Sequence, residues 1–234
     1  EYGCCLGGRS KFPIDVARRV RDALPANVAV LVKTNLRDGF EGGLEVEDAP
    51  RVAFYGDSYT LGTGASDPSL RWSSIICAER GWQEFNPSVN GLGFVNNRAT
   101  DGEGDLPALV IANDPSIVFI TMGLNDNFSY DRAANQIRLR ITEDFTRLAT
   151  ALPDARFIVV EPFWYTDRRP ESVEVIIGWV RDAAAAIGAD YIPGASHWIE
   201  GHPEWMASDG LHPNDAGYAA MATRMDAELT KLGL

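Results

Sequence analysis

The chain has 234 residues, of which 45% are hydrophobic and 23% are charged, and its net charge is −12. This length supports a sizeable core, and the composition is ordinary for a globular protein of one domain. The negative charge argues against nucleic-acid binding because phosphates would be repelled, and no apolar run approaches the ~18 residues of a membrane span.

The three cysteines, Cys4, Cys5 and Cys77, are an odd number and indicate no disulfide framework, so the cellular compartment stays open. The chain begins at Glu1 without a signal-peptide pattern, and we interpret it as a processed product or an excised fragment. This interpretation favours a secreted protein or part of a larger extracellular one.

Residues 1–50 are predicted to form a small N-terminal addition, in which we find no chemistry. Residues 15–24 mix apolar and charged side chains with the period of an amphipathic helix, and residues 28–32 are a strand candidate. We expect this segment to cover one side of a main domain that comprises residues 51–234.

From Arg51 onward, predicted strands and helices alternate along the chain. Strands at this rhythm with intervening helices are typical of a parallel sheet covered on both faces, which is an α/β fold of three layers, α/β/α. Ligands of such sheets bind at the carboxyl ends of the strands. The expected strands are 52–55, 84–89, 117–121, 157–160 and 190–192, and the expected helices are 72–80, 106–112, 133–151, 172–187 and 214–232.

Ser58 stands just after the first buried strand, on a predicted turn from strand to helix. A side chain on such a turn can point into solvent at the carboxyl edge of the sheet. Far downstream, Asp209 precedes His212 by three residues, so its carboxylate could orient the imidazole as a base. Together these residues suggest a serine nucleophile with its base and the group that orients the base.

Two further blocks of residues follow predicted strands. Asn125 comes directly after the strand 117–121, and its amide could donate a hydrogen bond to a developing oxyanion without competing as an anion. Gly91 follows the strand candidate 84–89, and a glycine fits where the backbone must approach a substrate closely. Gly93 is only two residues away, so the assignment of Gly91 is the less specific of the two.

The four blocks, taken in order, resemble those of the SGNH, or GDSL, hydrolase superfamily. The resemblance covers residues 51–234 and implies a flavodoxin-like fold and an esterase that needs no cofactor and no metal. It implies that Ser58 is the nucleophile, that His212 is its base and that Asp209 orients the imidazole. It also implies an oxyanion hole made by the backbone N–H groups of Ser58 and Gly91 and by the side chain of Asn125. The blocks are 56–59, 86–91, 123–126 and 209–213.

Each candidate residue could instead have a purely structural role. Ser58 could cap a helix, Asn125 could close a turn, and His212 could be a hydrogen-bonded surface histidine. A metal site is a separate alternative, but its candidate ligands match no helix-borne zinc motif. These ligands are His197, Glu200, His202 and Glu204. The segment 101–105 mimics the start of a calcium loop, and the residues that follow it do not fit one.

Aromatic side chains in the loops near the blocks are the basis for predicting the substrate. Aromatic faces can stack on sugars or line an acyl pocket, and Trp164, Tyr165 and Trp198 are the candidates for substrate contact. We expect short acyl groups such as acetyl on a carbohydrate, with a small molecule or saccharide ester as the partner and the oligomeric state left open. Acyl transfer, a longer-chain lipase or thioesterase, and a carbohydrate-binding module on a degenerate hydrolase fold are the alternatives.

Overall fold

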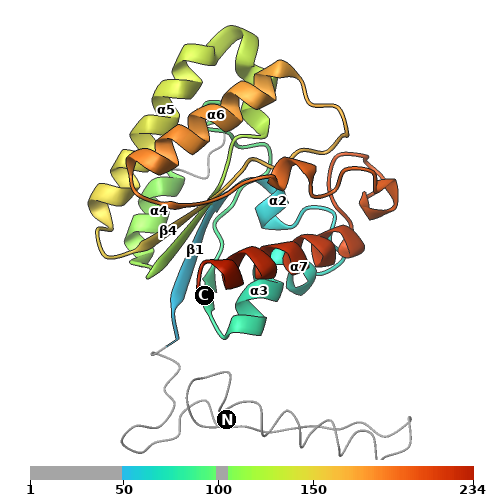
Figure 1. Ribbon diagram of the computed structural model, residues 1–234, viewed down its shortest axis with the longest axis horizontal. Coiled ribbons are helices and arrows are strands. Elements are labelled where there is room, and N and C mark those ends of the chain that lie inside the picture. The colour runs from blue at the N-terminus through green and yellow to red at the C-terminus, as the bar shows by residue number, and fades with distance from the viewer. Residues whose placement is uncertain (1–48, 99–104) are drawn as a thin grey trace, which may run out of the picture.

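A five-stranded parallel sheet lies at the centre of the computed structural model, which describes residues 49–98 and 105–234. The strand order is β2-β1-β3-β4-β5, so the chain moves outward from β1 in two directions (Figure 1). A sheet of this order has a crevice beyond the carboxyl ends of β1 and β3, where ligands bind. The strands are β1 (Arg51–Gly56), β2 (Gln83–Phe85), β3 (Ile117–Thr121), β4 (Arg156–Val160) and β5 (Asp190–Ile192).

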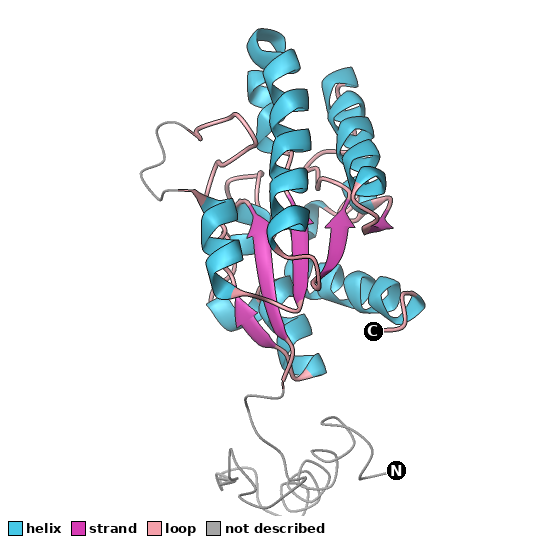
Figure 2. Cartoon of the chain, turned by 90° about the vertical axis from the view of Figure 1, so that its left-hand side faces the viewer, coloured by secondary structure: helices cyan, strands magenta, loops and turns pink. Residues whose placement is uncertain are grey.

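Helices cover both faces of the sheet, which confirms the predicted three-layer α/β/α fold (Figure 2). Two of them, α3 and α7, pack on one face, and α4, α5 and α6 pack on the other. The helices are α2 (Ser58–Leu61), α3 (Trp72–Arg80), α4 (Leu106–Asn113), α5 (Tyr130–Ala151), α6 (Glu171–Ala186) and α7 (Asp215–Lys231).

The side chains of β1 show why this run of residues forms a central strand. Val52 and Phe54 belong to the apolar layer under α3 and α7, whereas Ala53 and Tyr55 belong to the layer under α4, α5 and α6. Successive side chains of a strand point to opposite faces, so a strand buried on both faces needs an unbroken apolar run. The strand predicted at 52–55 is therefore present and central.

The register between β1 and β3 brings two distant blocks of the sequence to one place. Gly56 pairs with Thr121, so the two strands end at the same level of the sheet. The chain then continues from β1 into Ser58 and from β3 towards Asn125. Because parallel strands share their carboxyl edge, both residues lie at that edge.

Several element boundaries differ from those predicted. The strand expected at 84–89 is limited to Gln83–Phe85, because Pro87 cannot donate to a neighbouring strand and the chain leaves the sheet. The helix expected at 133–151 begins three residues earlier, at Tyr130. Within the described residues, four short 3-10 helices were not predicted, since three to five residues are too few to show a hydrophobic period. They are Pro68–Leu70, Asn125–Ser129, Ala195–His197 and Pro203–Trp205.

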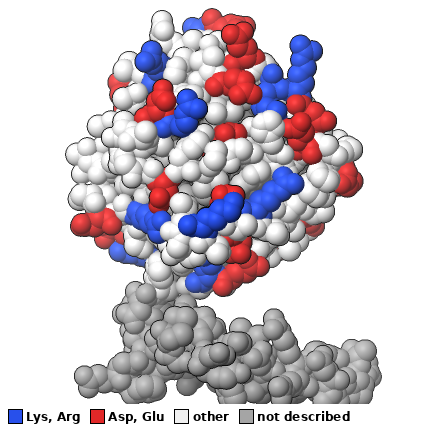
Figure 3. Space-filling model, viewed as in Figure 1, with Lys and Arg blue, Asp and Glu red and all other residues white. Residues whose placement is uncertain are grey.

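The N-terminal addition predicted at 1–50 falls almost entirely on residues 1–48, which are outside the described residues, as are Cys4 and Cys5. The domain boundary therefore stays a prediction. Cys77 is a buried free thiol. Acidic and basic side chains both occur across the face of the molecule drawn in Figure 3. Among the helices that the structure describes, none is long and apolar enough to cross a membrane.

Candidate active site

Ser58 is the first residue of α2, directly after the turn that ends β1. The turn is tight at Gly56, where an added Cβ would lie 2.5 Å from the Oγ1 atom of Thr121 and 2.6 Å from the Cβ atom of Thr60. Asp57 caps the helix, because its Oδ1 atom accepts the backbone N–H of Tyr59 at 3.0 Å. Ser58 is only 3% exposed, so the expectation of an open, solvent-facing serine is wrong.

Asp209 and His212 form a hydrogen-bonded pair in the turn that precedes α7. The Oδ2 atom of Asp209 lies 2.7 Å from Nδ1 of His212, and its Oδ1 atom accepts the backbone N–H groups of His212 and Leu211 at 3.0 and 2.9 Å. Hydrogen bonds from His212 lower the pKa of Asp209 to about 2; the bond from its backbone N–H has the largest effect, followed by the bond from its side chain. An ionised carboxylate at Nδ1 holds the proton there, which leaves Nε2 of His212 free to accept one.

Tyr59 ties this turn to the helix that carries Ser58. Its hydroxyl donates to the carbonyl oxygen of Leu211 at 2.6 Å, although the two residues are 152 apart in the sequence. The rings of Tyr59 and His212 have centroids 6.1 Å apart. The neighbours of Ser58 and of His212 are therefore in direct contact, and the structure brings the first and fourth blocks together.

Asn125 begins the 3-10 helix Asn125–Ser129 after β3 and is 7% exposed. Its Nδ2 atom donates to the Oδ2 atom of Asp57 at 3.2 Å and to the carbonyl oxygen of Leu92 at 3.0 Å. The third block thus contacts both the first block and the loop that follows the second. In this state both amide hydrogens have acceptors within the protein.

The carboxyl group of Asp57 is buried next to the candidate nucleophile, with 1% of the residue exposed. Burial is the largest cause that raises its pKa, to about 7; the N–H of Tyr59 opposes this shift and the charge of Asp126 adds to it. No local pattern in the sequence predicts its hydrogen bond to Asn125, which lies 68 residues further along the chain.

The loop after β2 carries the two candidate glycines. Gly91 has a φ of +72°, a conformation that suits glycine, and its carbonyl oxygen accepts the Nδ2 group of Asn96 at 2.9 Å. The N–H of Gly93 donates to the carbonyl oxygen of Asn96 at 2.9 Å, so this N–H is already used. The N–H of Val89 donates to the carbonyl oxygen of Gly56 at 3.3 Å, which places the loop against the end of β1.

Asp126 is the residue of this region whose position sequence reasoning missed. It is 0% exposed, and its carboxylate accepts backbone N–H groups of residues 94–96. No local pattern reveals a contact between segments about thirty residues apart.

The aromatic candidates for substrate contact lie deeper than expected. Trp164 is 2% exposed, and its indole N–H donates to the Oγ1 atom of Thr166 at 2.9 Å; Trp198 is 8% exposed and packs against Phe163. Neither tryptophan presents a free ring face, which corrects the expectation that they stack on a sugar. Tyr165 is partly buried against Trp164, with ring centroids 4.6 Å apart.

The residues of the alternative metal site form two separate pairs. His197 bonds to Glu200 at 2.5 Å, and His202 bonds to Glu204 at 2.8 Å while its ring stacks on Trp205. Within residues 49–98 and 105–234, no group of three or more histidine, cysteine or acidic side chains is placed to hold a metal ion.

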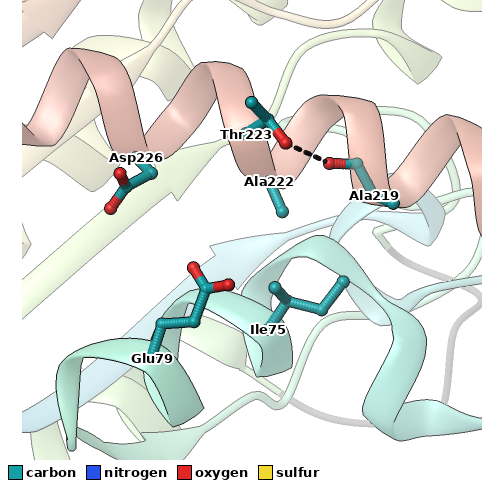
Figure 4. A pocket seen from close by; sticks show the side chains of 6 residues that line it. All are labelled: Ile75, Glu79, Ala219, Ala222, Thr223 and Asp226. Atoms are coloured by element: carbon teal, nitrogen blue, oxygen red, sulfur yellow. Dashed lines mark hydrogen bonds between the residues drawn. The ribbon is translucent and has the colours of Figure 1, made fainter.

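A hollow of about 290 Å³ lies between α3 and α7 and contains none of the candidate site residues (Figure 4). Its walls are alanine, isoleucine and threonine side chains with two carboxylates, one of which, Asp226, is paired with Arg80. We therefore place the active site at the carboxyl edge of the sheet and not in this hollow.

A buried serine near a partly exposed histidine–aspartate pair, at the edge of a 2-1-3-4-5 parallel sheet, is the arrangement of a serine hydrolase. The chain belongs to the GDSL-like Lipase/Acylhydrolase family, whose family model matches residues 54–220. The resemblance inferred from the sequence is thereby confirmed, and the chain is a carboxylic ester hydrolase of this family.

Similar proteins carry names that agree with this class. The chain is 28% identical over 189 residues to the GDSL lipase Rv0518 of Mycobacterium tuberculosis (strain ATCC 25618 / H37Rv), covering 74% of this chain and 79% of the lipase. The crystal structure of TesA matches with a TM-score of 0.62 and 22% identity, over 78% of this chain and 99% of TesA. Axe2, an acetylxylan esterase from Geobacillus stearothermophilus, matches with a TM-score of 0.55 and 17% identity, over 74% and 91% of the two chains. The two structural matches show a shared fold.

Proposed function

We propose that the chain cleaves its ester through an acyl-serine intermediate formed on Ser58. The Nε2 atom of His212 accepts the proton of the Ser58 hydroxyl as its oxygen attacks the ester carbonyl, and then gives this proton to the leaving alcohol. The same nitrogen next takes a proton from the water that releases the acid. The observation that carries the proposal is the 2.7 Å pair of His212 and Asp209, held beside α2 by the bond from Tyr59 to Leu211.

The oxyanion of the tetrahedral intermediate would be stabilised by the backbone N–H groups of Ser58 and Gly91 and by the amide of Asn125. Gly91 is favoured over Gly93 because the N–H of Gly93 is already bonded within its loop. Of the two bonds that the Asn125 amide makes, the one to Asp57 is longer, at 3.2 Å. We expect the substrate oxygen to share this N–H, while the bond to Leu92 keeps the side chain in place.

For the substrate, we propose a short acyl group such as acetyl, carried by a carbohydrate. The fold shared with Axe2, an acetylxylan esterase, supports this proposal, as does the partly exposed ring of Tyr165 in the loop after β4. Tyr165 is the aromatic candidate for direct contact, with Trp164 and Trp198 packed beneath the loop. A longer-chain lipase is the second candidate, since the GDSL lipase Rv0518 is similar in sequence.

A panel of p-nitrophenyl esters from acetyl to palmitoyl, assayed beside acetylated sugars, tests the substrate proposal. We expect turnover to fall as the acyl chain lengthens and acetylated sugars to be cleaved. A profile that rises towards octanoyl or longer would move the substrate to lipids or acyl thioesters. An excess of acylated product over free acid when a sugar acceptor is added would instead indicate acyl transfer.

Labelling by a fluorophosphonate probe tests the mechanism separately from the substrate. The wild type should be labelled and Ser58→Ala should not. An unlabelled wild type that still binds carbohydrate would indicate a binding module on a hydrolase fold. Equal labelling of both proteins would mean that another residue is the nucleophile.

A further inference from the structure

The strongest unexplained feature beside the site is the buried carboxylate of Asp126. It is 0% exposed, and its oxygens accept three consecutive backbone N–H groups, from Phe94 at 2.7 Å, Val95 at 2.9 Å and Asn96 at 3.2 Å. Burial raises the pKa of Asp126, while these N–H groups and the charge of Arg98 oppose the increase. A buried acid in such a cradle acts as an anchor for the loop that wraps around it.

The loop is shaped to admit this carboxylate. A Cβ added at Gly93 would lie 2.6 Å from both oxygens of Asp126, so only a glycine lets the backbone come this close. The anchor also suits an acid in particular. Three N–H donors need an acceptor, and a carboxylate offers two oxygens, whereas the amide of an asparagine would turn N–H groups towards the donors.

Hydrogen bonds continue from the anchored turn to the candidate oxyanion donors. The Nδ2 group of Asn96 donates to the carbonyl oxygen of Gly91 at 2.9 Å, and Oδ1 of Asn96 accepts the hydroxyl of Ser129 at 2.6 Å. The neighbouring carbonyl, that of Leu92, accepts the amide of Asn125 at 3.0 Å. Asn125 and Asp126 are adjacent, so one short segment holds both ends of the loop.

We infer that Asp126 is a positioning residue, whose carboxylate sets the loop 91–96 so that the Gly91 N–H and the Asn125 amide face the same point. The inference rests on the proposed function, since it assigns these two groups to the oxyanion hole. Asp126 is enclosed by the loop 91–96, so it acts through this loop and not on the substrate. A displacement of about 1 Å in such donors is enough to cost ~10²-fold in rate.

The test compares Asp126→Asn with Asp114→Asn in the full chain. Asp114→Asn is the same chemical change at a surface position, where the side chain is 80% exposed and pairs with Arg51. With p-nitrophenyl acetate we expect kcat of Asp126→Asn to fall ~10–100-fold with KM within about twofold. The control should stay within about twofold in both constants. Hydrogen exchange at the Phe94 amide should become faster in Asp126→Asn alone.

A purely structural role predicts a different result. The folded fraction of Asp126→Asn, taken from thermal unfolding, gives its kcat per folded molecule. If this kcat equals that of the wild type, the inference is overturned. A change confined to KM also overturns it. If Asp126→Asn does not fold, Asn96→Ala keeps the carboxylate but removes the shorter of the two side-chain bonds to the Gly91 carbonyl, the other being that of Asn97 at 3.1 Å. It should lower kcat by ~10-fold, and an unchanged kcat rejects the inference. A wild type without Ser58-dependent turnover would reject the proposed function itself, and the inference with it.

Discussion

The buried carboxyl group of Asp57 should make the protein less stable as the pH rises from about 4 to about 7. Its pKa is about 7 in the folded chain and 3.8 in the unfolded chain, so the folded state holds a proton that the unfolded state releases. The stability from this group is fully present below about pH 4 and is lost as the pH rises through about 7. Three pH units at about 1.4 kcal/mol each give a loss on the order of 4 kcal/mol.

Asp57→Asn removes this titration, and the observable is the difference in slope between the two proteins. We expect the free energy of unfolding of the wild type to fall relative to that of the variant by about 1.4 kcal/mol per pH unit between pH 4.5 and 6.5. Any loss of stability that the amide of Asp57→Asn causes at every pH does not affect the result, because only the slopes against pH are compared. Urea unfolding followed by tryptophan fluorescence, at constant ionic strength and half-unit pH steps, measures both curves.

Asp114→Asn is the matched control and should run parallel to the wild type, because its carboxyl group is on the surface. Parallel curves for wild type and Asp57→Asn would refute the reasoning. They would mean that Asp57 is ionised in the folded protein at pH 5, with Asn125 and the N–H of Tyr59 compensating its burial.

Three further predictions concern activity. Ser58→Ala should lower ester hydrolysis by at least ~10³-fold without unfolding the domain, and His212→Ala should lower it by nearly as much. The double variant should be little slower than either single variant, because the two residues act as one unit. Near-normal turnover, or losses that add in single-turnover assays, would contradict the assignment. Asn125→Ala should lower kcat by ~10²–10³-fold with little change in KM, since the oxyanion exists only in the transition state, and steady-state kinetics showing a KM effect alone would make Asn125 a ground-state contact. Tyr165→Ala should weaken turnover of an acetylated sugar far more than that of p-nitrophenyl acetate, and equal losses on both substrates would reject a sugar contact for Tyr165.

The fold was predictable because its signals are local. A run such as 117–121 is buried at every position and apolar in its first four residues, as a strand covered on both faces requires, and the long helices Tyr130–Ala151 and Glu171–Ala186 each bury one apolar face. The predicted boundaries are wrong where a single residue ends an element, as Pro87 does for β2, and the 3-10 helices were missed because they are too short to show a period.

The site was predictable only in part, for a related reason. Ser58, Asp209 and His212 stand at fixed places next to strand and helix ends, so their order along the chain carries information. The burial of Trp164 and the contacts of Asp126 depend on segments that meet only in the folded chain. Loop aromatics have no period that separates a packed ring from an exposed one, which is why the tryptophans were placed at the surface.

The attachment of the histidine turn to α7 has a consequence for how activity is lost on heating. The buried side chains of this helix, among them Tyr218 and Met225, pack in the apolar layer with α3. The loop held by Asp126 is anchored through α5, on the opposite side of the sheet. Partial opening of the C-terminal helix alone would carry away the base while the serine and the oxyanion donors keep their places. We therefore expect inactivation to begin below the temperature at which the sheet melts, and to reverse on cooling.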